Sequence, residues 1–198
     1  DPEQMEAPET MRIAIPVTCL ARGGGIRFLI AIGAGLVERG HDVHYLMLAG
    51  QPVEYQVKGR FSTVPVLAPE YMPDADLILP NFYMTVPAAM SGRGTPARLC
   101  LGYEPFFVAN REEARKTYEL PMPIAAISGW LAKVLLEHNG RRSRVINPGV
   151  DHTVFYPGSG GRSPTTVVCI ARDQSGGNYW FKGRSEEHTS ELQSRHNL

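Results

Sequence analysis

The sequence has few cysteines, no net charge and no long hydrophobic run, and each shortage excludes a class of protein. Cys19, Cys100 and Cys169 are odd in number, widely spaced and set in apolar segments, which favours buried free thiols over disulfides or a metal site. A formal net charge of +0 gives no global field that would attract nucleic acid. No apolar segment approaches the roughly 20 residues that span a bilayer. We therefore expect a soluble, cytoplasmic globular protein.

The start of the chain alternates between apolar segments and a glycine-rich turn. Arg12–Val17 predicts a strand, and the loop after it ends on three glycines, Gly23, Gly24 and Gly25. Apolar positions across residues 26–39 predict a mostly buried helix, and Gly40 is the residue type that commonly follows a helix end. Residues 43–48 predict a second strand. This succession predicts a βαβ unit with parallel strands and a right-handed connection.

The same alternation continues to about residue 150. Further strands are predicted at residues 64–67, 75–79, 97–102, 124–127 and 145–146. Helices are predicted at residues 111–118 and 129–138, the second with Ser128 as its N-cap. The pattern predicts an α/β fold with a Rossmann-like, doubly wound parallel sheet.

The glycine loop is the first candidate site. Helix N-termini bind anions because their first amides lack partners and the helix dipole is positive there. Glycines let a phosphate approach the backbone closely, and Arg22 and Arg27 flank the loop. A tight turn without a ligand is an equally good interpretation. A nicotinamide dinucleotide is disfavoured, because Phe28 stands where the third fingerprint glycine would be and no acidic residue ends the second strand.

Residues 147–157 (NPGVDHTVFYP) form the second candidate, and their spacing alone indicates no catalytic geometry. The segment resembles the signature that ends the first domain of glycosyltransferase family 4, the retaining enzymes with the two-domain GT-B fold. The opening MRIAI strand, residues 38–43 (ERGHDV) and residues 128–131 (SGWL) also resemble that family. The resemblance implies that Asp151 and Phe155 have structural roles at the interdomain connection.

The resemblance also implies site residues. Arg172 and Lys182 would bind the donor diphosphate, together with Gly24 and Gly25 of the glycine loop described above, although the loop before Lys182 is longer than in the family pattern. Cations are needed there because the leaving nucleoside diphosphate gains charge. Tyr103 and Glu104 would bind the acceptor, with Glu104 as the catalytic residue, and we expect both to open onto the same edge of the sheet as the glycine loop. The Tyr-Glu pair resembles a rhamnosyltransferase-like subgroup.

Each of these assignments has a competing interpretation. Glu104 could equally be a solvated loop carboxylate, and Arg172 and Lys182 could be two exposed basic residues in a loop. No cofactor or metal is expected: the sequence Asp74-Ala75-Asp76 contains two acids, but it opens a buried strand and is interpreted as a turn.

The domain organisation follows from composition. Residues 11–157 are expected to form the acceptor-side domain and residues 158–164 (GSGGRSP) a linker. Residues 165–183 would begin a nucleotide-sugar-binding domain that stops after its first strand, at residues 165–171. Residues 184–198 resemble a translated sequencing-library adapter over the eleven residues RSEEHTSELQS, so we expect this tail to make no packed contacts.

These observations lead to two functional hypotheses. The first is a fragment of a retaining glycosyltransferase that transfers a sugar from a nucleoside-diphosphate sugar to a glycan or lipid-linked acceptor. Such a fragment, lacking most of the donor domain, is expected to be inactive by itself. The enzyme would act in the cytoplasm, with peripheral association at the inner face of the membrane as an option, and would bind no nucleic acid. The alternative is a non-catalytic Rossmann-like module that binds a nucleotide or phosphate.

Overall fold

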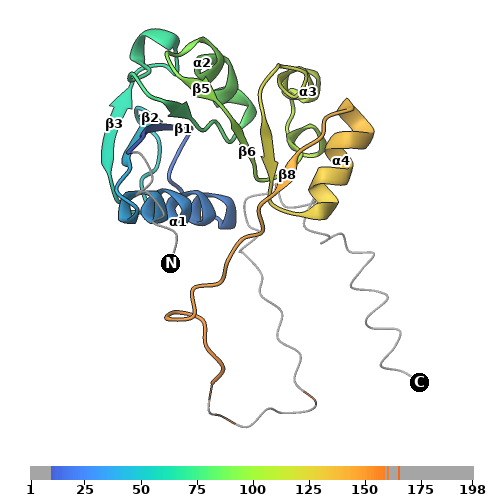
Figure 1. The fold of residues 1–198 in the computed structure, drawn as a ribbon. Coiled ribbons are helices and arrows are strands. Elements are labelled where there is room, and N and C mark those ends of the chain that lie inside the picture. The colour runs from blue at the N-terminus through green and yellow to red at the C-terminus, as the bar shows by residue number, and fades with distance from the viewer. Residues whose placement is uncertain (1–9, 159, 161–164, 166–198) are drawn as a thin grey trace, which may run out of the picture. The chain divides into compact units, whose positions relative to one another are not determined.

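The computed structural model describes residues 10–158 together with residues 160 and 165 (Figure 1). The chain divides into one compact unit that ends at Gly149 and a second that begins at Val150. The strands of the first unit are β1 Arg12–Val17, β2 Asp42–Leu48, β3 Arg60–Val64, β4 Leu77–Ile78, β5 Thr95–Pro96, β6 Arg98–Cys100, β7 Ile124–Ala126 and β8 Arg144–Val145. Its α-helices are α1 Gly24–Glu38, α2 Val86–Ser91, α3 Arg111–Thr117 and α4 Gly129–Asn139, with short 3₁₀ turns η1 Pro69–Tyr71, η2 Tyr83–Thr85 and η3 Glu104–Phe106.

The strands form two parallel sheets that lie side by side and meet at the segment containing β5 and β6. One sheet has the order β3-β2-β1-β4-β5 and the other the order β6-β7-β8, and every pairing is parallel. Strands β5 and β6 are consecutive parts of one extended segment, along which the amides of Ala97 and Leu99 donate to the carbonyls of Ile78 and Pro80 at 2.9 Å. This is the Rossmann-like, doubly wound α/β fold that the sequence predicts, and its strand order reverses between β1 and β4.

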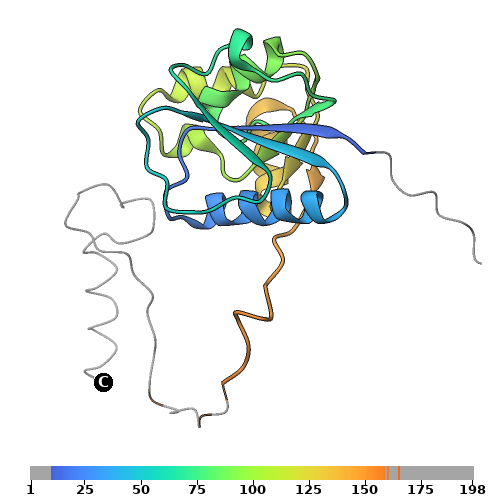
Figure 2. The same ribbon diagram turned by 90° about the vertical axis from the view of Figure 1, so that its left-hand side faces the viewer.

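Helices cover both faces of the five-stranded sheet (Figures 1 and 2). On one face, α1 packs over alternate residues of β1 and β2, and on the other, α2 and the turns before it cover the remaining residues of the same strands. The predicted helix at residues 26–39 is therefore found, but only Leu29 and Gly33 are fully buried in it. The two cores contain Ile13, Ile15, Val17, Leu20, Leu29, Val43, Tyr45, Met47 and Leu99 on the α1 side, and Ala14, Leu46, Val64, Met72, Ala75, Ile78, Ala88 and Ala89 on the α2 side.

The boundaries of α4 follow from local chemistry. Ser128 has an extended backbone, and its side chain accepts a hydrogen bond from the amide of Leu131 at 3.1 Å, as a helix N-cap does. The helix ends at Gly140, whose φ of 63° is the left-handed conformation that favours glycine. The predicted cap and helix are confirmed.

Two elements differ from the sequence predictions. The third strand covers Arg60–Val64 rather than residues 64–67, because residues 60–64 pair in register with His44 to Leu48 of β2. Helix α2 was not predicted. It has six residues, with a proline in its first turn, and it is held by the burial of Val86, Ala88 and Ala89 against the sheet. Both differences come from pairing and packing between distant segments, which local patterns do not report.

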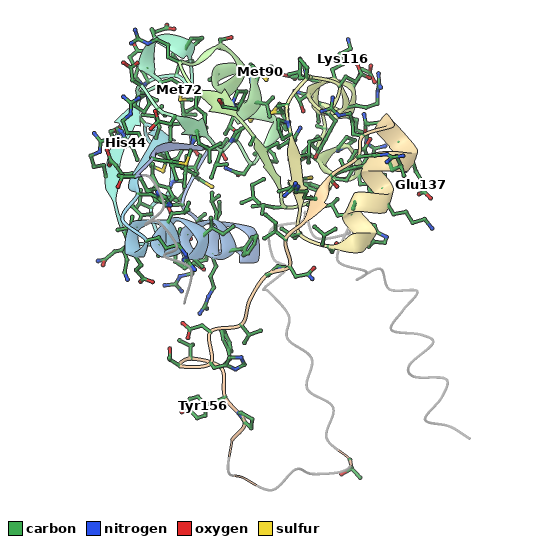
Figure 3. The ribbon with its side chains drawn as sticks, viewed as in Figure 1. His44, Met72, Met90, Lys116, Glu137 and Tyr156 are labelled. Atoms are coloured by element: carbon green, nitrogen blue, oxygen red, sulfur yellow. The ribbon has the colours of Figure 1, made fainter. Side chains whose placement is uncertain are left out.

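The surroundings of His44 lead us to expect that the stability of this sheet depends on pH. His44 lies on β2 near β3 (Figure 3), where its Nε2 is 2.8 Å from the Ser62 hydroxyl and its buried Nδ1 has no hydrogen-bond partner among the described residues. Burial, and then the charge of Arg60, lower the pKa of His44, whereas Asp42 opposes the shift. The folded state thus prefers the neutral imidazole, and the unfolded state takes up the proton more readily.

The stabilisation from neutral His44 is therefore present above the ordinary histidine pKa of about 6.5 and is lost as the pH falls below it. We expect the difference in melting temperature between the unsubstituted protein and His44→Gln to change as the pH is lowered from about 7.5 to about 5, with the unsubstituted protein losing more. Equal losses in both proteins would contradict this assignment.

Candidate functional site

The glycine loop lies at the carboxyl edge of the sheet. Strand β1 ends at Val17, the loop follows, and Gly23 is the N-cap of α1. Strands β1 and β4 are the neighbours between which the strand order reverses, and open α/β sheets bind ligands outside the carboxyl ends of such strands. The fold therefore places Gly24 and Gly25 where the sequence predicts them.

The N-terminus of α1 is built differently from that of α4. Within the described residues no side chain caps α1, and its first turn contains no acidic residue, whereas α4 is capped by Ser128. A Cβ atom added at Gly23 or Gly24 would meet nothing within 4 Å. The φ of Gly23 is −178°, an extended conformation open to any residue, so neither packing nor strain explains the glycine there. The amides of this turn can donate hydrogen bonds to an anion that approaches the backbone closely.

The base of the glycine loop is anchored to the loop after β2. Leu20 and Val53 form an isolated parallel bridge, with the Leu20 amide donating to the Pro52 carbonyl at 3.0 Å. The amide of Arg22 donates to the carboxylate of Glu54 at 2.6 Å. These contacts hold the loop in place as far as Arg22. The glycines that follow belong to the start of α1.

The turn after β6 lies beside the glycine loop. A Cβ atom at Gly25 would be 3.3 Å from Leu101 Cδ1, so α1 begins against the residue that follows β6. Tyr103 and Glu104 come directly after it, at the same edge as the glycine loop, as predicted. Their side chains do not open onto that edge, however, because Tyr103 is only 3% exposed and Glu104 only 2%. The expectation of open side chains and the alternative of a solvated Glu104 are both wrong.

Glu104 instead belongs to a buried ion pair. Nη2 of Arg98 donates to both carboxylate oxygens of Glu104, at 3.0 and 3.1 Å, and Nη1 donates to the Thr117 hydroxyl at 2.9 Å. The guanidinium carbon is 3.6 Å from the ring centroid of Tyr118, whose hydroxyl also contacts the Glu104 carboxylate. We call Arg98, Glu104, Thr117 and Tyr118 the buried charge cluster. With both oxygens engaged inward, direct contact between Glu104 and an acceptor is not supported by this geometry.

Burial is the largest influence on the pKa values of Glu104 and Cys100. Desolvation raises the pKa of the Glu104 carboxyl, and the charge of Arg98 opposes that rise. Desolvation, followed by the nearby Glu104 charge, raises the pKa of the Cys100 thiol to about 12. Cys100 is therefore an unreactive thiol, consistent with the predicted buried free cysteine, whereas Cys19 is partly exposed.

Tyr103 also has a structural partner. Its hydroxyl donates to the Asn139 side chain at 2.7 Å, and its ring packs against those of Phe106, Tyr118 and His138 at centroid distances of 4.8, 5.2 and 5.3 Å. These contacts join η3, α3 and α4 into the third core of the unit. The acceptor-binding role predicted for Tyr103 and the catalytic role predicted for Glu104 are untested.

Charged pairs gather at the opposite end of the strands. At the amino ends, Arg12 pairs with Asp76 at 2.7 Å and Arg60 with Asp42 at 2.6 Å, and Arg93 pairs with Asp74 at 2.7 Å. A hydrogen bond from Arg12 holds the pKa of Asp76 below its usual value. Asp74 and Asp76 are thus engaged with arginines away from the glycine loop. Among the described residues, no group of three histidine, cysteine or acidic side chains could hold a metal ion.

No protein-family model matches this chain, and no curated protein matches it either.

The remaining predicted residues divide between the second unit and undescribed parts of the chain. In the second unit, the Asp151 carboxylate accepts hydrogen bonds from the amide and hydroxyl of Thr153, at 2.9 and 2.6 Å, and the Asp151 carbonyl accepts from the amides of Val154 and Phe155. Asp151 therefore shapes a turn. Arg172, Lys182, Cys169, and the predictions for residues 165–183 and 184–198 lie outside the described residues. No helix in the described part is long and apolar enough to cross a membrane.

Sequence reasoning missed Arg98 and Tyr118. The available signal was Arg98 itself, a charged residue inside the otherwise apolar segment ARLCLG. A charge in a buried strand requires a buried partner, because an isolated ion is strongly disfavoured there. That partner is six residues away at Glu104, the residue that the sequence suggested for catalysis.

Proposed function

We propose that this chain carries the acceptor-side domain of a retaining glycosyltransferase with a two-domain fold, and that its glycine loop binds the diphosphate of a nucleotide sugar. The sugar would pass to a glycan or lipid-linked acceptor. Diphosphate binding is supported by the N-terminus of α1, which no described side chain caps. It lies where the strand order reverses, and there is open space over Gly23 and Gly24. The proposal of a glycosyltransferase rests on the resemblance of residues 147–157 to the signature of that family.

The charge layout supports this location. The amino edge of the sheet carries arginine–aspartate pairs, whereas the first turn of α1 contains no acid and receives no side-chain cap from the described residues. A diphosphate placed there would gain several backbone hydrogen bonds and the favourable end of a 15-residue helix. The turn formed by Asp151 is consistent with a structural role at a domain connection.

The ligand part is tested by replacing Gly24 with alanine. Gly24 is the first residue of α1, and an added methyl group would meet no protein atom, so the fold should be kept. The methyl group would instead stand where the phosphate approaches the backbone. We expect pyrophosphate and nucleoside diphosphates to bind about tenfold more weakly to Gly24→Ala, a loss of about 1.4 kcal/mol. Calorimetry and amide chemical shifts of residues 23–25 measure this.

Gly129→Ala is the matched control. Gly129 is also the first residue of a helix with open space around its Cβ position, but its helix is capped by Ser128. This variant should bind pyrophosphate as the unsubstituted chain does. If neither pyrophosphate nor any nucleoside diphosphate shifts the amides of residues 23–25, the ligand assignment is wrong. Sugar transfer is assayed for the full protein with a panel of nucleoside-diphosphate sugars; inactivity with every nucleotide sugar would favour a non-catalytic binding module.

A further inference from the structure

The turn after β6 connects the buried charge cluster to the glycine loop. On one side, Leu101 lies against Gly25 at the start of α1. On the other side, the carbonyl of Gly102 accepts hydrogen bonds from the Tyr118 hydroxyl at 3.0 Å and from the Cys100 thiol at 3.2 Å. Tyr118 is the residue that follows α3, so a residue sixteen positions along the chain determines where this carbonyl lies.

The charges of this cluster are weak evidence for a stabilising role. A buried ion pair loses most of its Coulombic gain to desolvation, and apolar residues of similar volume are often at least as stable. Here Nε of Arg98 is also buried, with no hydrogen-bond partner in the part of the chain that the structure describes, which adds a further penalty. What the charges provide is direction: Arg98 holds Glu104 and stacks on Tyr118, and the tyrosine hydroxyl lies between the Glu104 carboxylate and the Gly102 carbonyl, the two acceptors that its single proton can reach.

We infer that Tyr118, held by Arg98 and Glu104, is a positioning residue for the glycine loop. By fixing the Gly102 carbonyl it keeps Leu101 against Gly25, and this contact restrains the first turn of α1 so that its amides are oriented before a ligand arrives. Glu104 then contributes through Tyr118 rather than by touching a substrate. The inference rests on the proposed function, because its consequence is measured as diphosphate binding at Gly24 and Gly25.

The experiment compares Tyr118→Phe with Thr117→Val in the full chain. Tyr118→Phe keeps the ring beneath Arg98 and removes the hydroxyl that reaches both the Gly102 carbonyl and the Glu104 carboxylate. Thr117→Val is nearly isosteric and removes another buried hydroxyl of the same cluster, one that bonds Arg98 but not Gly102. Pyrophosphate affinity is measured for both variants, together with the nuclear Overhauser contact between the Leu101 methyl groups and Gly25. Thermal unfolding checks that both variants are folded at the temperature used.

We expect Tyr118→Phe to weaken pyrophosphate binding about three- to tenfold and to weaken the Leu101–Gly25 contact, with Thr117→Val close to the unsubstituted chain. Equal affinity in the unsubstituted chain and Tyr118→Phe would overturn the positioning role and leave the proposed function standing. Equal losses in both variants would also overturn it, since they would indicate general destabilisation. If the unsubstituted chain binds no pyrophosphate, the proposed function and this inference fail together.

Discussion

Replacing Arg98 with methionine is expected to lower the free energy of unfolding by about 3–5 kcal/mol. The substitution leaves the Glu104 carboxylate buried without the cation that donates to both of its oxygens. The Thr117 hydroxyl keeps a bond, because it donates to the Ala114 carbonyl. Domains of this size are stable by only about 5–15 kcal/mol, so the loss should be plain in urea denaturation. It should shrink toward about pH 4, where a carboxyl with a raised pKa is protonated and no longer needs a cation.

The double variant Arg98→Met/Glu104→Leu provides the control. Removing both charges leaves no buried ion, so most of the lost stability should return. The difference between the double variant and the sum of the single variants measures the coupling of the pair. A loss below about 1 kcal/mol for Arg98→Met would match an exposed ion pair and contradict the buried arrangement. A double variant no more stable than Arg98→Met would show that packing, rather than charge, is lost.

Gly33→Ala is expected to destabilise the domain even though alanine is the better helix former. Helix propensity alone favours the substitution by about 1 kcal/mol. Gly33 is buried against β2, however, and an added Cβ would lie 1.8 Å from the hydroxyl oxygen of Tyr45 and 2.7 Å from its Cζ. Tyr45 is fully buried, so its ring has no open space to enter. We expect a net loss of about 1–3 kcal/mol, measured by urea or thermal unfolding.

Gly35→Ala, in the same helix, is the matched control. Its added Cβ would meet only the guanidinium end of Arg39 at 3.2 Å, a flexible group that can move. Gly35→Ala should therefore stabilise the protein by about 0.5–1 kcal/mol. The double variant Gly33→Ala/Tyr45→Phe should recover part of the loss, because the closest clashing atom is removed. A stabilising Gly33→Ala would contradict the packing of α1 on β2.

The two glycines also show how much can be predicted from the local sequence pattern. Gly33 and Gly35 are both interior positions of the helix predicted at residues 26–39, and nothing in their neighbours distinguishes them. One is required by a tyrosine twelve residues away on β2, and the other is not. The same limit of local sequence patterns applies to Glu104 in the candidate site. Its place after a strand predicted its edge of the sheet correctly, but its burial depends on Arg98, Thr117 and Tyr118.

By itself, the sequence determined the alternation of strands and helices, the parallel Rossmann-like class, the cap at Ser128 and the edge of the sheet at which the glycine loop lies. These features follow from apolar periodicity and from backbone preferences, which act within a few residues. Only the tertiary structure decided that Arg60–Val64 forms β3, that Val86–Ser91 is helical, that Glu104 faces inward and that Leu101 meets Gly25. Each depends on contacts between segments distant in sequence, and periodicity shows that a side chain is buried without showing which partner it meets.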